Sequence, residues 1–298
     1  MFKKLSELEL LIKKNKVVKV LALAVSQDAD SLSAVCKAYN AGIIKPVLIG
    51  DVELTKSIIK KAGYNFEGAT FIDESDPELC VERAVKMVSR GEADVLMKGK
   101  VATPVLLKAV LNKEWGLREG KLLSHFALFE VETYHKLIAV TDVAMNIGPN
   151  LNDKIAIINN SVGYLNKLGI HKPKVAVLGA IEMVNESMQA TLDAALLSKM
   201  NQRDQIKNCI IDGPLAFDNA ISFESARHKN IKSSVAGDTD LLLMPDIEVG
   251  NVLYKTLIFF AKAKVASVIL GAKSPIVLTS RSDSEESKYH SILLAILG

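Results

Sequence analysis

The chain has 298 residues, of which 49 % are apolar, enough to bury one large core or two medium ones and too many for a disordered protein. Its 37 Lys and Arg residues against 34 Asp and Glu residues give a net charge of +3, which is too small to favour a nucleic-acid-binding surface. Lys, Asp or Pro interrupts every apolar run before it reaches the roughly 18 residues of a membrane-spanning helix, so we expect no membrane partner.

The three cysteines, Cys36, Cys80 and Cys209, are odd in number and widely spaced. This pattern favours buried free thiols in a reducing compartment, so we expect a cytoplasmic protein without a disulfide framework. No CxxC motif or Cys/His cluster indicates a metal site, and we predict none. Residues 1–16 have helical spacing and an apolar run too short for a secretory signal, which predicts an amphipathic first helix.

Short apolar runs alternate along the chain with longer helical patterns. Runs of strand length occupy residues 17–25, 46–49, 93–97, 137–140, 174–178, 208–211, 241–244 and 265–270. Segments of 3.6-residue periodicity include residues 30–41, 77–89, 185–199 and 249–262. The alternation predicts an α/β fold with mainly parallel sheets that helices cover on both faces.

A domain boundary is expected near residues 141–150, where Gly, Pro and Asn follow a predicted strand, as in a hinge or crossover. We therefore predict a first α/β domain of residues 1–140 plus about 277–298, and a second α/β domain of residues 141–276. Ligands in such folds sit beyond the carboxyl ends of strands. Polar residues directly after the apolar runs are thus the first candidates for function.

The most informative polar segment is residues 278–286, which follows a strand-like run and precedes a helical pattern. A helix N-terminus presents unpaired N–H groups, and Arg281 beside it can clamp two phosphate oxygens, which together indicate a phosphate site. The alternative is structural: Ser282 and Glu285 form a capping box and Arg281 pairs on the surface.

A second polar segment, residues 97–104, also follows a predicted strand. Lys98, Lys100 and Thr103 suit a phosphate, and Gly99 allows a ligand to approach the backbone. The segment is neither a Walker loop nor a dinucleotide fingerprint, since GxxxxGK[ST] and GxGxxG occur nowhere in the chain. A solvated loop is the alternative.

Two acidic segments and one histidine complete the candidates. Asp212 and Asp218 can hold a ligand hydroxyl or cap the next helix. Asp246 is predicted to cap a helix, and Gly250 in its first turn admits either a ligand or a packed backbone. His125 lies in a predicted strand, where a structural histidine is the alternative to a functional one.

Taken together, the order and spacing of these segments resemble the phosphate acyltransferases, most closely the butyryl-transferring members. The resemblance extends from about residue 21 to the C-terminus and is most specific over residues 212–284. It rests on Lys98-Gly99 with Thr103, Ser124-His125, Thr141-Asp142 with Asn146, Asp212-Gly213-Pro214-Leu215 with Phe217-Asp218, Pro245-Asp246 with Gly250-Asn251 and Tyr254-Lys255, Gly271-Ala272-Lys273, and Thr279-Ser280-Arg281.

The resemblance implies an active site in a cleft between two domains, a homo-oligomer, and reversible transfer of an acyl group from acyl-CoA to inorganic phosphate. Coenzyme A is then a substrate, and no tightly bound cofactor is expected. Ser280 would support the transition state and Arg281 would bind phosphate. The implied substrate-binding residues are Lys98, Gly99, Thr103, Ser124, His125, Asp142, Asn146, Asp212, Asp246, Gly250 and Lys255.

The chain departs from the acetyl-transferring relatives at the proposed base, a carboxylate seven positions beyond the serine, because Ser287 stands there. Asp283 is the preferred substitute and Glu286 the second choice, although both can simply favour the helix dipole. The alternatives left open are acetyl or another acyl group, a fatty-acyl phosphate synthase, a dehydrogenase of the same architecture, and a non-catalytic homologue that binds CoA or phosphate.

Overall fold

The computed structural model describes residues 2–279 and 283–298, and the chain forms two compact units. The terminal unit comprises residues 5–121 and 266–298, and the central unit comprises residues 1–4 and 122–265. The predicted boundaries lie near residues 140 and 277. Since a compact unit need not be an independently folding domain, the domain boundaries stay a prediction.

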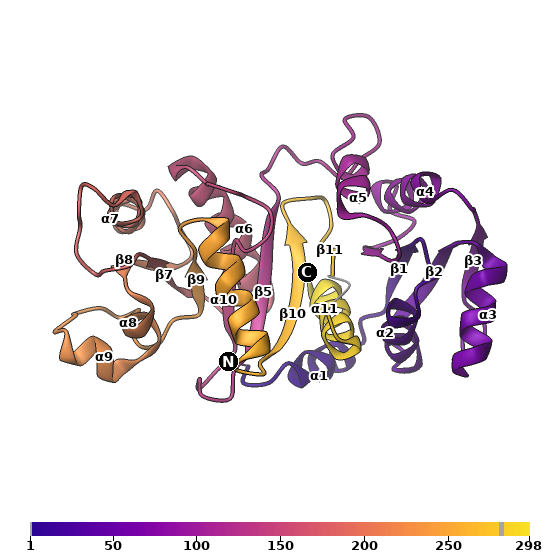
Figure 1. The fold of residues 1–298 in the computed structure, drawn as a ribbon, viewed down its shortest axis with the longest axis horizontal. Coiled ribbons are helices and arrows are strands. Elements are labelled where there is room, and N and C mark those ends of the chain that lie inside the picture. The colour runs from indigo at the N-terminus through magenta and orange to yellow at the C-terminus, as the bar shows by residue number, and fades with distance from the viewer. Residues whose placement is uncertain (1, 280–282) are drawn as a thin grey trace. The chain divides into compact units, whose positions relative to one another are not determined.

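The terminal unit contains a mostly parallel sheet with the strand order β3-β2-β1-β4-β11-β10 (Figure 1). The only antiparallel pair among these described strands is β10 with β11, while the other neighbours run parallel. The strands are β1 (Lys19–Ala24), β2 (Ile44–Gly50), β3 (Thr70–Asp73), β4 (Val95–Lys98), β10 (Lys264–Leu270, in this unit from residue 266) and β11 (Ile276–Val277).

Helices cover this sheet, and several begin at an aspartate. Asp28, Asp51 and Asp76 each accept a backbone N–H at the start of a helix, which satisfies donors that the helix itself leaves unpaired. The C-terminal helix α11 packs against α1 and α2. The helices are α1 (Ser6–Lys14), α2 (Ala29–Asn40), α3 (Val52–Ala62), α4 (Pro77–Ser89), α5 (Thr103–Val110) and α11 (Glu285–Leu297).

The central unit contains a second mostly parallel arrangement, with the strand order β5-β6-β9-β7-β8. The antiparallel pair here is β5 with β6. Its strands are β5 (Ser124–Glu130), β6 (Ile138–Thr141), β7 (Lys174–Leu178), β8 (Ile210–Leu215) and β9 (Leu241–Leu243), and its helices are α6 (Leu151–Lys167), α7 (Gln189–Gln202), α8 (Phe217–Ile221), α9 (Phe223–His228) and α10 (Ile247–Phe259). A buried core that includes Phe129, Val140 and Leu242 lies against Leu253 and Leu257 of α10.

The predicted α/β class is confirmed, because each predicted strand and helix overlaps an observed one. The strands of β1 and β4 are buried, as expected for parallel strands with both faces covered. Several strand boundaries differ from the predicted ones, and the difference is largest at β8. Asn208 has a left-handed φ of 62°, so β8 begins at Ile210 instead, and it continues through Asp212 to Leu215.

Of the capping interpretations, one is confirmed and one is not. Helix α11 begins with Ser284 as its N-cap, whose hydroxyl accepts the backbone N–H of Ser287, whereas Ser282 of the alternative capping box lies outside the described residues. Asp212 lies inside β8 and caps no helix. Asp246 is the N-cap of α10 and accepts the N–H of Val249 at 2.9 Å.

The predicted free thiols are confirmed, since Cys36, Cys80 and Cys209 are all buried and unpaired with one another. Burial raises the pKa of the Cys80 and Cys209 thiols to about 11. Among the described residues, none of the helices has the length and apolar character needed to cross a membrane. The same residues contain no group of three or more His, Cys, Asp or Glu side chains that could hold a metal ion.

Candidate active site

A cavity of about 240 Å³ lies in the terminal unit at the carboxyl end of β4. This is the edge at which parallel α/β sheets usually bind ligands. The cavity, called here the lysine cavity, is lined by Asp28, Asp30, Ser31, Lys98, Gly99, Lys100, Thr279 and Lys288.

Lys98, predicted to bind substrate, ends β4 and is only 6 % exposed. Its ammonium group donates to the carbonyl oxygens of Gly99 (3.3 Å) and Val101 (3.4 Å). An ammonium group taken out of water is costly unless acceptors or anions surround it. Lys98 therefore places a positive charge on the cavity wall.

At position 99, close packing of the backbone requires a glycine, whereas the sequence suggested the approach of a ligand. A Cβ at this position would clash with the backbone carbonyl oxygens of Val25 and Ala24 at the end of β1. The absence of a side chain therefore lets two backbone segments meet beneath the lysine cavity.

Lys288, which the sequence analysis did not select, is a second buried lysine of the same cavity, with an exposure of 3 %. It lies in the first turn of α11, donates to the carbonyl oxygen of Asp283 (2.9 Å) and lies 3.5 Å from the carboxylate of Asp30. Two buried ammonium groups on one small cavity make an environment that favours an anion.

The beginning of α2 forms another part of this wall. Asp28 caps the helix, and its carboxylate accepts hydrogen bonds from the backbone N–H and the hydroxyl of Ser31. This carboxylate is thus engaged in holding the helix start.

The two predicted catalytic residues, Ser280 and Arg281, lie outside the described residues. The described residues on either side of them in the sequence belong to the lysine cavity or contact it. Thr279 lines the cavity, and the carbonyl oxygen of Asp283 accepts the hydrogen bond from Lys288. Thr103 begins α5 and is not among the residues that line the cavity.

The central unit brings a second group of predicted residues together around Asp142, at the carboxyl end of β6. The buried carboxylate of Asp142 accepts hydrogen bonds from the backbone N–H groups of His125 (3.1 Å), Ala144 (2.9 Å) and Met145 (2.9 Å) and from the side-chain amide of Asn146 (2.6 Å). The same amide also reaches the carbonyl oxygen of Leu123 at 2.9 Å. Asp142 therefore fixes the positions of His125 and Asn146.

Ser124 and His125, at the start of β5, are both buried. The Ser124 hydroxyl accepts a hydrogen bond from the amide of Asn160 (3.0 Å), and the His125 ring meets the Tyr254 ring edge-on at 5.9 Å. Burial lowers the pKa of His125, although the nearby Asp142 carboxylate opposes this shift. The imidazole is therefore neutral at physiological pH.

Gly250 belongs to the same group for a steric reason. A Cβ at Gly250 would clash with the carbonyl oxygen of Asp142 and lie 3.0 Å from the Cα of Val143. Of the two sequence interpretations, a packed backbone is the one observed. Helix α10 can approach the segment after β6 only because position 250 has no side chain.

Three predicted residues lie away from this group. Lys255 is exposed on α10, and Asp212 lies in β8 with its carboxylate on its neighbour Gly213. Asp246 lines a separate cavity of about 540 Å³, whose wall also holds the buried ion pair of Lys154 and Asp193 (2.6 Å).

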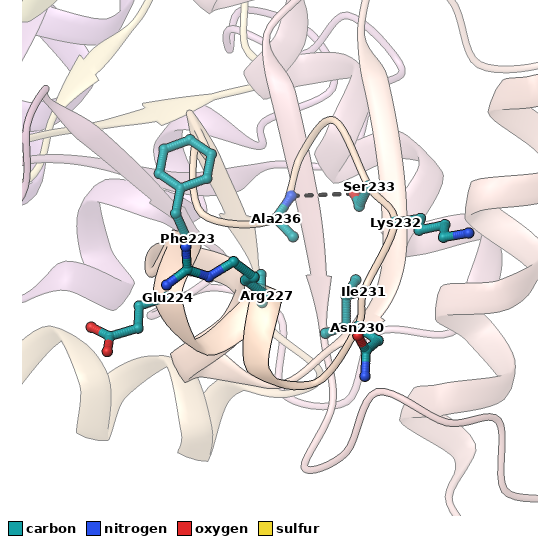
Figure 2. Close-up of a pocket in the computed structure, with 9 residues that line it drawn as sticks. Phe223, Glu224, Arg227, Asn230, Ile231, Lys232, Ser233 and Ala236 are labelled. Carbon is teal, nitrogen blue, oxygen red and sulfur yellow. Dashed lines mark hydrogen bonds between the residues drawn. The ribbon is translucent and has the colours of Figure 1, made fainter.

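A further cavity of about 780 Å³ lies beside α9 and contains no predicted residue (Figure 2). Figure 2 shows Phe223, Glu224 and Arg227 on the helix and Asn230 to Ser233 on the loop that follows it.

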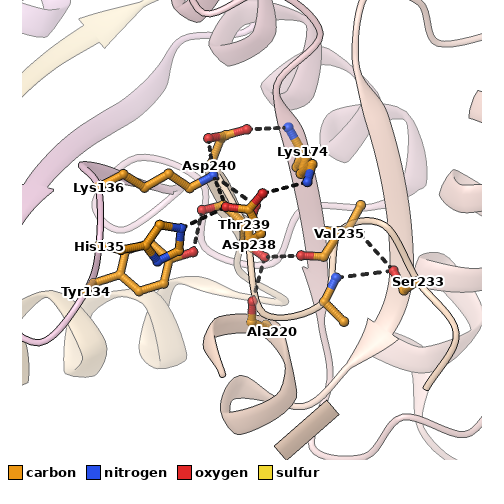
Figure 3. Close-up of polar contacts among 11 residues, drawn as sticks. Tyr134, His135, Lys136, Lys174, Ala220, Ser233, Val235, Asp238, Thr239 and Asp240 are labelled. Carbon is orange, nitrogen blue, oxygen red and sulfur yellow. Dashed lines mark hydrogen bonds and ion pairs between the residues drawn. The ribbon is translucent and has the colours of Figure 1, made fainter. Parts of the chain in front are cut away.

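A charged cluster occupies the opposite, amino-terminal edge of the strands of the central unit (Figure 3). Lys136 pairs with Asp238 (2.8 Å) and Asp240 (2.6 Å), and Lys174 pairs with Asp238 (2.6 Å). These residues precede or begin β6, β7 and β9, so the cluster holds three strand starts together. The cluster lies at the ends of these strands opposite the carboxyl ends where ligands bind, so we assign it a role in stabilising the fold.

Four residues of these two sites were not predicted: Asp28, Asp30, Lys288 and Asn160. The two aspartates lie at the start of α2, just beyond the carboxyl end of β1, so extending the search from the strand ends to the next helix start would have found them. Lys288 and Asn160 lie on helices, where a single polar residue gives no signal of burial.

The sequence model of the phosphate acetyl/butaryl transferase family matches residues 79–296. The chain belongs to this family. A phosphate butyryltransferase of Clostridium beijerinckii is 48 % identical over 279 residues, which cover 94 % of this chain and 92 % of the relative. A phosphate acetyltransferase of Thermotoga maritima is 47 % identical over 277 residues, which cover 93 % of this chain and 94 % of the relative.

A solved structure extends the likeness to the fold. The branched-chain phosphotransacylase of Enterococcus faecalis V583 superposes with a TM-score of 0.84 at 34 % identity, covering 94 % of this chain and 98 % of that one. Membership of the phosphate acetyl/butaryl transferase family confirms the resemblance seen in the sequence, and the match includes both the lysine cavity residue Lys98 and the whole segment 279–288.

Proposed function

We propose that this protein transfers a short acyl group, butyryl in the first place, between coenzyme A and inorganic phosphate. Family membership makes the chain an acyltransferase, and curated relatives with both butyryl and acetyl names cover more than nine-tenths of it. The observation that carries the proposal is the lysine cavity. Two buried lysines and Thr279, the residue before Ser280, line a space whose charge suits a phosphate.

The reaction needs few groups. In the direction of acyl phosphate synthesis, a phosphate oxygen attacks the thioester carbonyl carbon, the C–S bond breaks, and the thiolate of coenzyme A leaves and takes up a proton. The carbonyl oxygen carries negative charge in the intermediate, and Ser280 would stabilise this charge. Arg281, with Lys98, would hold the phosphate through charge-assisted hydrogen bonds. Direct transfer requires no acyl-enzyme.

In the reverse direction a base is required, because the thiol of coenzyme A has a pKa of about 8.5 and is mostly protonated at neutral pH. Asp283 is the proposed base, and its position next to the segment of Ser280 and Arg281 supports the choice. Glu286 is the alternative, in the first turn of α11.

The central unit would contribute the substrate-binding residues of the Asp142 group. Neutral His125 can donate or accept a hydrogen bond without bringing a charge, and the Asn146 side chain is fixed by two hydrogen bonds. Coenzyme A as substrate, a homo-oligomer and a cytoplasmic location stay predictions of the same proposal.

The test is a thiol-release assay with phosphate and a series of acyl-CoA substrates from acetyl to octanoyl. We expect phosphate-dependent release with the highest kcat/KM for butyryl-CoA. Ser280→Ala should lower kcat about 10²- to 10³-fold, as expected for removal of one donor to an oxyanion. Release that does not depend on phosphate would refute the proposal, and a preference for acetyl-CoA would select the acetyltransferase alternative.

A further inference from the structure

Lys288 has an incomplete set of partners for a buried ammonium group. The group carries three N–H donors, and among the described residues one makes a good hydrogen bond, to the carbonyl oxygen of Asp283 at 2.9 Å. The second contact, to Asp30, is 3.5 Å long, at the limit of a hydrogen bond. A lysine that is 3 % exposed normally has better compensation than this.

Asp30 is a replaceable partner. Its side chain is 62 % exposed, so it can turn into water without a desolvation cost, whereas the Lys288 side chain has no comparable freedom. Asp28, the other carboxylate of the lysine cavity, is engaged in capping α2. The lining therefore holds three lysines against one engaged and one weakly paired carboxylate.

We propose that Lys288 binds a phosphate oxygen in the lysine cavity, and that the phosphate displaces Asp30 from Lys288 when it enters. The inference rests on the proposed function in that phosphate is the substrate. It adds a phosphate contact besides Arg281, and it makes Asp30 a competitor of the substrate for the same ammonium group.

The structural arrangement fits this exchange. Lys288 and Lys98 approach the cavity from α11 and from the end of β4, so a tetrahedral anion can take a hydrogen bond from each. The start of α2 lies on the same wall and adds the positive end of its dipole. The hydrogen bond to Asp283 would stay in place and keep the Lys288 side chain oriented.

The experiment measures binding of inorganic phosphate without coenzyme A, by calorimetry and by the phosphate-dependent rise in melting temperature, for four variants. Lys288→Met should weaken binding about 10- to 100-fold, the range expected for loss of a charge-assisted hydrogen bond, and Lys288→Arg should restore most of it. Asp30→Asn should tighten binding about two- to fivefold because it removes the competitor.

Lys100→Met is the matched control. It removes the same charge from the same cavity, but Lys100 is exposed and its field is screened, so binding should fall by no more than about threefold. An equal loss in Lys100→Met and Lys288→Met, or weaker binding in Asp30→Asn, would overturn the inference. If Lys288→Met does not fold, the phosphate affinity of Asp30→Asn still tests the inference, because this variant is expected to bind phosphate more tightly.

Binding and turnover separate this inference from the proposed function. Unchanged phosphate binding in Lys288→Met, with acyl transfer that depends on Ser280, refutes the inference and leaves the function. If the variants show the predicted order of phosphate affinities but the protein transfers no acyl group, the proposed function is refuted and the anion site stands.

Discussion

The carbonyl oxygen of Asp142 occupies the space that a side chain at Gly250 would need. This packing joins the first turn of α10 to the segment that positions His125 and Asn146. We expect Gly250→Ala to displace that segment, to lower the free energy of unfolding by about 1–3 kcal/mol and to reduce kcat/KM. Urea unfolding and steady-state kinetics check both effects.

A glycine without a packing role supplies the control for this change. Gly163 lies on α6, and a Cβ there would meet no atom within 4 Å. Gly163→Ala should leave kinetics unchanged and stabilise the protein by about 0.5–1 kcal/mol, since glycine is disfavoured in helices. Equal behaviour of the two variants would contradict the role assigned to Gly250.

Arg281→Ala should raise the KM for phosphate about tenfold or more and leave the KM for acyl-CoA within about twofold. The reason is that the guanidinium group is proposed to contact only the phosphate. Initial rates at varied phosphate and fixed acyl-CoA measure the effect. Unchanged phosphate kinetics would remove Arg281 from the site.

Two variants compare Asp283 and Glu286 directly as the base. Asp283→Asn should flatten the rise of the acyl-CoA-forming rate with pH more than Glu286→Gln does, because a base must be ionised to take the thiol proton. Rates with acyl phosphate and coenzyme A between about pH 6 and about pH 9 give the profiles. The reverse ranking would assign the role to Glu286.

His125 should make stability depend on pH. Because its pKa is lowered in the folded protein, the unfolded chain binds a proton that the folded one does not as the pH falls below about 6.5. The stability contributed above that pH is therefore lost progressively, down to the pKa of the folded state. Urea unfolding of His125→Gln between about pH 5 and about pH 8 should show a smaller dependence on pH than unfolding of the unmodified protein.

The cluster around Lys136 should affect stability without affecting catalysis. Burial raises the pKa of Asp238, but hydrogen bonds from Lys136, Lys174 and His135 outweigh burial and hold the pKa well below its usual range. Lys136→Met leaves buried Asp240 without this partner and should lower the free energy of unfolding by about 3–5 kcal/mol. Phosphate and acyl-CoA KM values should not change, and a specific rise in either would contradict the separation.

Buried strands were the easiest elements to predict. The run that forms β1 is apolar after its first residue, Lys19, because the rest of the strand is covered on both faces, and this composition is visible in the sequence. Strand β3 was not predicted: it lies at the edge of the sheet, and its two middle residues are only half-buried while its two end residues are exposed. Short edge strands bury too little apolar surface to leave a clear pattern.

The site was predictable to the extent that its residues follow strands. Lys98 and Asp142 end or follow β4 and β6, and both line or organise a polar site, as the carboxyl-end rule predicts. Lys288 was not predictable in this way, because its burial depends on α11 packing against α1 and α2, which are distant in the sequence. The need for glycine at position 250 likewise depends on the segment after β6, which lies more than a hundred residues away in the sequence.

The burial of the three native cysteines has a practical consequence for labelling. With a thiol pKa of about 11, roughly one molecule in ten thousand carries a Cys80 or Cys209 thiolate at neutral pH, and maleimides react with the thiolate. Cys36 is only 5 % exposed. A cysteine introduced on the surface should therefore accept a fluorophore selectively, with the native thiols left in place.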